Sequence, residues 1–263
     1  MNFNKIISSI NITNNNIDET QRQPKPCHEI ITDPKKCILR NKLWRGDIIP
    51  LLPIQRNYCI IDDTQFDIER LKIDLSIAQE YVKWTDKDLH THKWKAITMN
   101  SYKGTDQPML NENSINSESK QHYIPTKTLD QCLYFKEILK NFNTDIFLVR
   151  LLKLDAGGII KYHTDESIFK NRYDIIRCHI PIITDPKCKF QLGYPIQRPA
   201  TGNDGIWNAG LLHSCYITPG YMWYTNVNAL HGVHNDSTVD RVHLVIDMKP
   251  THEMMRRIYG NKN

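Results

Sequence analysis

Between residues 145 and 250 the sequence consists of short strand-like runs separated by glycine and proline turns. The runs are DIFLVRLLKL, IIKYHTD, DIIRCHIPII, KFQLG, YMWYTNV and RVHLVIDM, and the turns include Gly157-Gly158 and Pro219-Gly220. Many short strands with this punctuation are typical of a sandwich, a jelly roll or a barrel. We therefore expect a mainly β core at residues 145–250, with flanking helices.

The rest of the chain has a different character. Residues 1–45 are rich in Asn, Lys and Pro, which predicts a loosely ordered lead-in. Residues 46–144 are expected to form a mixed α/β segment that packs on the core. It contains strand-like runs, IIPLLPIQRNYCII and WKAITMNSYKG, and two helical patterns, FDIERLKIDLSIAQEYVKW and TLDQCLYFKEILKNF. The second pattern opens with a capping signal at Thr128 and Gln131. Residues 251–263 are predicted to be a tail or a short helix.

Composition sets the broad class of protein. Lys and Arg outnumber Asp and Glu by 34 to 29 in 263 residues, but the basic residues are scattered, so the case for nucleic acid is weak. The seven cysteines are odd in number and form no CxxC pair, which fits a reducing compartment. No signal-like or membrane-spanning apolar run is present, so we expect a soluble cytoplasmic protein.

Two of the predicted strands share an alternation of polar and apolar side chains. In DIIRCHIPII, Arg177 and His179 point to one side, and the other side holds Ile176, Cys178, Ile180 and Ile182. In RVHLVIDM, Arg241 and His243 share a side in the same way. A polar face backed by an apolar face on both strands predicts a polar-lined cavity inside a β-sandwich.

Four dispersed side chains suggest a metal centre. Two imidazoles and one carboxylate, from His163, Asp165 and His231, can occupy one face of a ferrous ion and leave positions open for a co-substrate and O2. Arg241, ten residues after the last of these, can hold a carboxylate through two parallel hydrogen bonds. This combination suggests an oxygenase.

The metal ligands have competitors within the sequence. A second His-x-Asp, at His234 and Asp236, lies in the turn-like run HNDSTVD, whereas the first follows a Gly-Gly turn and a short strand, so we prefer the first. For the last ligand, counting ten residues leads from His231 to Arg241 but from His234 to Leu244. Because only the arginine can bind an acid, we prefer His231.

The runs RCHIPIITDPKCKFQLG and PGYMWYTNVNALHGVHNDSTVDRVHLVIDM resemble the aspartyl/asparaginyl β-hydroxylase family of Fe(II)- and 2-oxoglutarate-dependent oxygenases, which also includes free amino-acid hydroxylases acting on proline. The resemblance covers about residues 145–250 and follows the order His-x-Asp, Arg-x-His, Pro-Gly-x-x-Trp, His-x-Val-x-Asn, Arg-x-His-Leu. It implies a double-stranded β-helix, the jelly-roll fold that is also described as cupin-like.

The resemblance also implies roles for particular residues. Fe(II) would be bound by His163, Asp165 and His231, the distal carboxylate of 2-oxoglutarate by Arg241, and co-substrate or substrate by Arg177 and His179. Further pocket candidates are Trp223, Tyr224, Asn226 and His243, with simple core packing as the competing interpretation of the two aromatic residues. The chain departs from the family at Tyr221 and Met222, where a glutamate often stands, and residues 191–212 read as an insertion. Mammalian-type members lack the metal carboxylate, so this chain looks closer to members with a full triad.

The predicted activity is hydroxylation of a C–H bond in an amino acid or in a peptidyl Asp/Asn-type residue, with succinate and CO2 as co-products. The expected partner is a small amino acid or a peptide, and neither a membrane nor nucleic acid is expected. Two alternatives stay open, a non-catalytic cupin-like binding module and a nucleic-acid demethylase with the same metal chemistry. The polar stretch at residues 105–127 is a candidate substrate lid, and an ordinary surface loop is the alternative.

Overall fold

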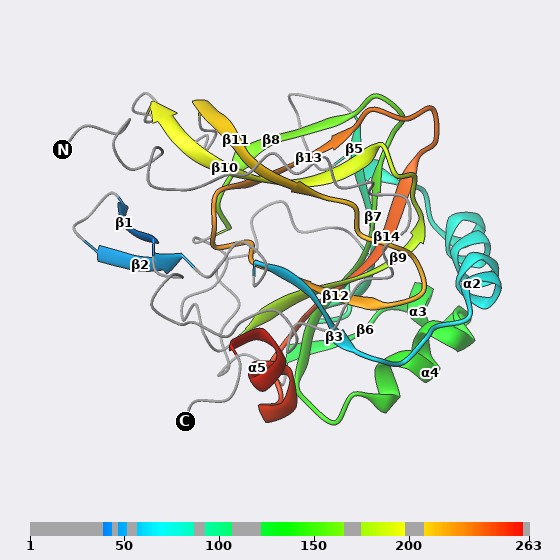
Figure 1. Cartoon of the computed structure of the whole chain (residues 1–263). Coiled ribbons are helices and arrows are strands. Elements are labelled where there is room, and N and C mark those ends of the chain that lie inside the picture. Colours follow the sequence, from blue (N-terminus) through cyan, green and yellow to red (C-terminus); the bar gives the residue numbers. More distant parts are fainter. Residues whose placement is uncertain are drawn as a thin grey trace.

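Two facing β-sheets form the centre of the molecule, and helices cover one outer side (Figure 1). The computed structural model describes residues 39–43, 47–51, 57–86, 93–106, 122–165, 175–197 and 208–259. A separate hairpin is formed by β1 (Leu39–Leu43) and β2 (Asp47–Leu51). No helix in these ranges is long and apolar enough to cross a membrane.

The larger sheet has eight strands. Its path runs β3 (Tyr58–Asp62), β12 (Met222–Thr225), β9 (Ile176–Ile183), β14 (Arg241–Met248), β7 (Ile146–Leu154), β5 (Trp94–Tyr102) and β4 (Thr85–Asp86), with β6 (Tyr123–Pro125) pairing to β5. The smaller sheet has the order β11 (Asn208–Cys215), β10 (Cys188–Gln197), β13 (His231–Asn235) and β8 (Ile159–His163). All of these strand pairs are antiparallel.

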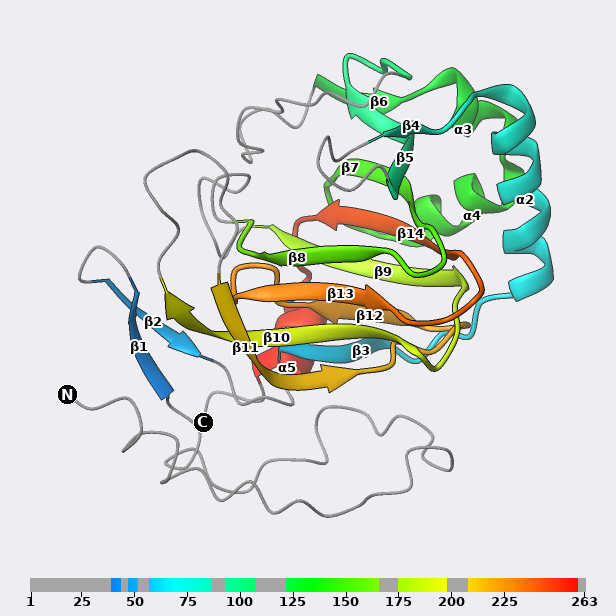
Figure 2. The same cartoon turned by 90° about the horizontal axis from the view of Figure 1, so that it is seen from above.

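The connectivity of β7 to β14 defines the fold. The large sheet contains β7, β9, β12 and β14, and the small sheet contains β8, β10, β11 and β13. The chain therefore crosses between the sheets repeatedly, and each sheet pairs strands that are distant in sequence (Figure 2). This is the predicted double-stranded β-helix, so the jelly-roll prediction is confirmed.

The outer face of the large sheet packs against the helices. Buried residues of β9 and β14, among them Cys178, Ile180, Leu244 and Ile246, share one core cluster with the helices. The alternation predicted for these two strands is therefore confirmed on the apolar side. Helix α2 (Ile68–Tyr81) presents its buried residues at helical spacing, and Asp67 caps it by accepting the backbone N–H groups of Glu69 and Arg70.

The second helical pattern forms two helices rather than the single helix predicted. These are α3 (Lys127–Gln131) and α4 (Leu133–Asn141), with extended backbone at Cys132 between them. The predicted cap at Thr128 is wrong, because Thr126 is the N-cap and its hydroxyl accepts the backbone N–H of Leu129. Thr128 lies inside α3 and donates its hydroxyl to Asp106 instead.

Several segment predictions are only partly covered by the described residues. Most of residues 1–45 lies outside them, and so does 107–121 of the candidate lid. The end of the candidate lid forms strand β6 and the N-cap residue Thr126 of helix α3. The two ends of the stretch 191–212 belong to the paired strands β10 and β11, and 198–207 lie outside the described residues. The C-terminal segment forms helix α5 (His252–Tyr259), which packs into the same core as the other helices.

Candidate metal centre

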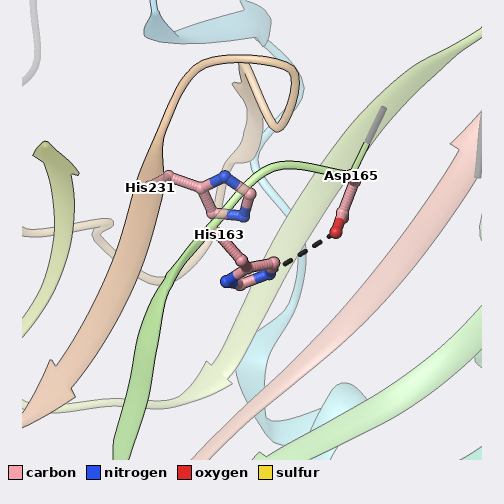
Figure 3. Close-up of side chains that lie close together, drawn as sticks. All are labelled: His163, Asp165 and His231. Atoms are coloured by element: carbon pink, nitrogen blue, oxygen red, sulfur yellow. Dashed lines mark ion pairs between the residues drawn. The ribbon is translucent and has the colours of Figure 1, made fainter. Parts of the chain in front are cut away.

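His163, Asp165 and His231 lie together, and one ligand atom from each falls within 4.8 Å of the others (Figure 3). His163 ends β8, Asp165 follows two residues later, and His231 begins β13. The Nε2 atom of His163 is 3.4 Å from Oδ1 of Asp165. The structure thus brings the three predicted ligands to one point from two strands of the small sheet.

Strand pairing places the two histidines side by side. In the β8–β13 pair, His163 and His231 stand opposite each other, and their ring centroids are 4.3 Å apart. Asp165 is fixed by its backbone, because its N–H donates to the carbonyl of Val227 at 2.9 Å. The loop after β8 is therefore tied to the turn that leads into His231.

The tautomer of each histidine follows from its hydrogen bond. Nδ1 of His163 lies 2.7 Å from the carbonyl of Lys161, and Nδ1 of His231 lies 2.9 Å from the carbonyl of Ala229. A carbonyl can only accept, so Nδ1 carries a proton in both rings, and Nε2 is the atom that each ring, when neutral, can offer to a metal. Backbone partners of this kind are common behind metal-binding histidines, where they fix the ring. Phe190 stacks on His231 and further restricts it.

Burial and nearby charges set the protonation of the triad. Burial raises the pKa of Asp165, but the guanidinium of Arg177 and the neighbouring imidazoles outweigh it and hold that pKa well below its usual range. Burial, together with His163, lowers the pKa of His231 to about 3. Burial also lowers the pKa of His163, but Asp165 outweighs it and the net shift is upward. An ionised carboxylate beside a neutral His231 is the state that a cation requires.

Arg177 contacts two acidic side chains behind the triad. It donates from Nη1 to Oδ2 of Asp165, from Nε to Oδ1 of Asp247 at 2.7 Å, and from Nη2 to Oδ2 of Asp247 at 3.0 Å. Nη2 of Arg150 also donates to Oδ2 of Asp247, at 3.2 Å. All four side chains are buried. The predicted role of Arg177 in binding co-substrate or substrate stays a prediction.

Arg241 is a buried cation whose contacts differ from those of Arg177. Its Nη2 donates to Nδ1 of His243 at 2.9 Å, and within the described ranges no salt bridge joins it to a carboxylate. Burial lowers the pKa of Arg241. Among the described residues, the thiol of Cys188 is the group that raises this pKa. A buried charge is costly unless an opposite charge compensates it, so this position suits an anionic ligand.

His179 and His243 complete the polar inner face of the large sheet. Their rings meet edge to face with centroids 5.6 Å apart. Burial, followed by Arg241, lowers the pKa of both rings well below the usual range, so both are neutral. Since Arg241 can only donate, Nδ1 of His243 is the acceptor and its Nε2 carries the proton. His243 thereby orients the guanidinium of Arg241.

The remaining pocket candidates lie in different places. Trp223 is part of the core between the sheets and donates its indole N–H to the carbonyl of Thr218 at 3.0 Å. Tyr224 belongs to the helix-covered core on the opposite face of β12, so the structure does not bring it to the triad. Asn226 donates to the side chain of Asn57 and holds the turn before β13.

Two site residues were missed by sequence reasoning, Asp247 and Arg150. Asp247 shares the inner face of β14 with Arg241 and His243, so the alternation along this strand was a signal for it. Arg150 pairs in register with Val245 of β14, and a lone arginine in an apolar strand such as β7 was also a signal. The contacts between these arginines and carboxylates depend on how the strands pair. Strand pairing cannot be read from the sequence.

Residues 65–250, well over half of the chain, match the aspartyl/asparaginyl β-hydroxylase family. The chain belongs to this family, as its motifs predicted, and it is therefore an oxidoreductase of the hydroxylase class. No curated protein matches the chain.

Solved structures with some likeness include an oxygenase, a hydroxylase and a carbocyclase. A 2-oxoglutarate and Fe(II) oxygenase family protein from Burkholderia pseudomallei is 14% identical over 73% of this chain and 84% of its own, with a TM-score of 0.41. A prolyl-4-hydroxylase from Pseudomonas putida is 10% identical over 74% and 93%, with a TM-score of 0.39. A carbocyclase of nogalamycin biosynthesis is 11% identical over 87% of each chain, with a TM-score of 0.44.

The donors present fit the iron and 2-oxoglutarate that the family chemistry implies. Two imidazoles and one carboxylate form the facial set that non-haem ferrous oxygenases use. The hydrogen bonds at Nδ1 leave Nε2 as the metal-binding atom of each neutral imidazole. The buried guanidinium of Arg241 matches the far carboxylate of a dicarboxylic acid in charge and in its planar shape.

Proposed function

We propose that this protein is a Fe(II)- and 2-oxoglutarate-dependent dioxygenase that hydroxylates a C–H bond of an amino acid, either free or within a peptide. The observation that carries the proposal is the convergence of the triad, with Nε2 of both histidines as the metal-binding atoms, in the same two-sheet core as a buried arginine for which the described residues provide no carboxylate partner. Family membership supports the same reaction class.

The triad and Arg241 would bind different groups. His163, Asp165 and His231 would hold the iron, and Arg241, oriented by His243, would hold the far carboxylate of 2-oxoglutarate. Iron and 2-oxoglutarate together supply the oxidation of a C–H bond by O2, with succinate and CO2 as co-products. The protein binds these groups, fixes their orientation and keeps water from them between the two sheets.

The space between the two sheets is lined by both neutral and charged side chains, which supports the binding of iron and 2-oxoglutarate there. His179 is neutral and lies on the central strand β9, between Trp223 and Val245 in the strand register. Arg150 and Arg177 form ion pairs with Asp165 and Asp247, so among these three arginines Arg241 is the one without a carboxylate partner in the described residues. This uncompensated cation suits the far carboxylate of 2-oxoglutarate.

A substrate screen tests the proposal. The protein with Fe(II), ascorbate and 2-oxoglutarate would be incubated with free amino acids and with peptides that contain Asp, Asn or Pro. We expect one substrate class to stimulate succinate release and to gain the mass of one oxygen atom. If 2-oxoglutarate neither binds nor is consumed while metal binds tightly, the chain is a binding module and the proposal is wrong.

A further inference from the structure

Asp165 presents its two carboxylate oxygens to different partners. Oδ1 is the oxygen nearest to the triad, 3.4 Å from Nε2 of His163. Oδ2 accepts a hydrogen bond from Nη1 of Arg177. The hydrogen bond and the positive charge of Arg177 make Oδ2 the less available oxygen for a cation, so this contact favours Oδ1 as the ligand atom and fixes its direction.

Arg177 is itself fixed by Asp247. Two parallel hydrogen bonds, Nε to Oδ1 at 2.7 Å and Nη2 to Oδ2 at 3.0 Å, join the side of the guanidinium to this carboxylate. Such a two-point contact defines the plane of the guanidinium as well as its position. The remaining nitrogen, Nη1, then points at Asp165. Asp247 is fully buried and lies opposite Arg177 in the β9–β14 register.

The charges of this buried group balance. Arg150 and Arg177 contribute two positive charges, and Asp165 and Asp247 contribute two negative ones. Without Asp247, Arg150 would lose the carboxylate that it contacts, and the charge of Arg177 would be left to Asp165, where it would compete with a bound ferrous ion. Asp247 therefore has an electrostatic role next to the metal centre as well as a geometric one.

We infer that Asp247 is a positioning residue of the metal centre, acting through Arg177 to hold Asp165 as a one-oxygen ligand. The inference rests on the proposed function, because it concerns the same triad. Outer partners of metal ligands typically contribute about 10–100-fold to metal affinity. Asp247 is not one of the three ligands, and its contact with Asp165 runs through the guanidinium of Arg177.

Cobalt(II) binding tests this inference without requiring turnover. The metal-free protein would be titrated with Co(II) in the absence of 2-oxoglutarate, following the visible absorption bands that report the ligand geometry. Asp247→Asn keeps the size of the side chain but removes its charge, and Arg177→Lys keeps the charge but loses the two-point contact. We expect both to raise the Kd for Co(II) by about 10–100-fold and to change the bands.

Asp74→Asn is the matched control, because Asp74 is also a buried acid but lies among the helices on the outer face. It should leave the Kd and the bands at wild-type values. If Asp247→Asn does not fold, as judged by circular dichroism, Arg177→Lys tests the same link. Wild-type Kd and bands in the folded variants would overturn the inference, as would an equal weakening in Asp74→Asn. A wild-type protein that takes up no Co(II) would overturn the proposed function too.

Discussion

His163 and His231 face each other across the antiparallel pair β8–β13, with ring centroids 4.3 Å apart. The two residues are far apart in the sequence, so this register alone brings the imidazoles together. A slip of one residue would turn one of the rings to the other face of the sheet. The metal centre is therefore a property of this strand pair, and changes that disturb the pair should disturb metal binding.

Gly232→Ala tests this dependence. A Cβ at position 232 would lie 2.8 Å from the carbonyl oxygen of Ile160, so β13 would have to move away from β8. We expect a loss of about 1–3 kcal/mol in the free energy of unfolding, as for overpacked cores, and a weaker affinity for Co(II). Urea denaturation and Co(II) titration measure the two effects.

Gly157→Asn is the control for this substitution. Gly157 has a φ of +66° in the turn before β8, but a Cβ there meets only the end of Lys93 at 3.6 Å. Asparagine tolerates this backbone region, so we expect a cost below about 1 kcal/mol and unchanged Co(II) affinity. Equal loss of Co(II) affinity in both variants would show that the strand register is not the cause.

Asp165→Ala should abolish succinate release and weaken Co(II) binding, because it removes one of three ligands and leaves Arg177 with one acidic partner fewer. The loss should exceed the roughly 10–100-fold effect of removing an outer partner. Asp236→Ala is the control, since Asp236 belongs to the second His-x-Asp and is exposed. Unchanged turnover in Asp165→Ala, or equal loss in Asp236→Ala, would refute the assignment of the ligands.

The alternation in β9 and β14 was predictable because it is local. Side chains alternate along any strand, so Arg177, His179, Arg241 and His243 could be assigned to one face before any pairing was known. What the sequence does not contain is the partner across the sheet. The contact of Arg177 with Asp247 depends on the β9–β14 register and therefore appears only in the folded protein.

Strand β13 could not be predicted from its own residues. Its sequence, HGVHN, has a glycine and two histidines in place of a β-branched run, and it becomes a strand by pairing with β8 and β10. The break between α3 and α4 had a similar cause. The buried carboxylate of Asp74 on α2 accepts the backbone N–H of Phe135, which favours a new helix start after Cys132.

Arg241→Lys should weaken the binding of 2-oxoglutarate, because lysine keeps the charge but not the planar fork that pairs with a carboxylate. Hydrogen bonds to charged groups contribute about 1.5–3 kcal/mol, so we expect the KM for 2-oxoglutarate to rise about tenfold or more. The rise in melting temperature that 2-oxoglutarate causes in the metal-loaded protein should shrink in parallel. Arg256→Lys on the surface of α5 is the control, and an equal shift there would exclude a specific role.

Asp74 should contribute to stability as the cap of α4. Its Oδ2 accepts the backbone N–H of Phe135 at 2.7 Å, and Cys132, the N-cap residue, makes no side-chain capping bond. Asp74→Ala leaves this buried N–H without its acceptor, so we expect a loss of about 1–3 kcal/mol in the free energy of unfolding. Asp74→Asn retains an acceptor and should lose less. Equal losses in urea denaturation would contradict the capping role.

The same carboxyl group predicts a dependence of stability on pH. Burial raises the pKa of Asp74 in the folded protein, against the backbone hydrogen bonds from Phe135 and Tyr134 that lower it. The folded state therefore favours the protonated form of Asp74, and ionisation of this carboxyl lowers the free energy of unfolding. The loss is absent at acid pH and complete above the pKa of Asp74 in the folded protein. Asp74→Asn does not bear this cost. The free energy of unfolding of Asp74→Asn, relative to wild type, should therefore increase as the pH rises from the acid side of the carboxyl range to neutrality. Urea denaturation across that range measures it, and a relative stability that is constant or falls with pH would show that the Asp74 carboxyl is not destabilised by burial.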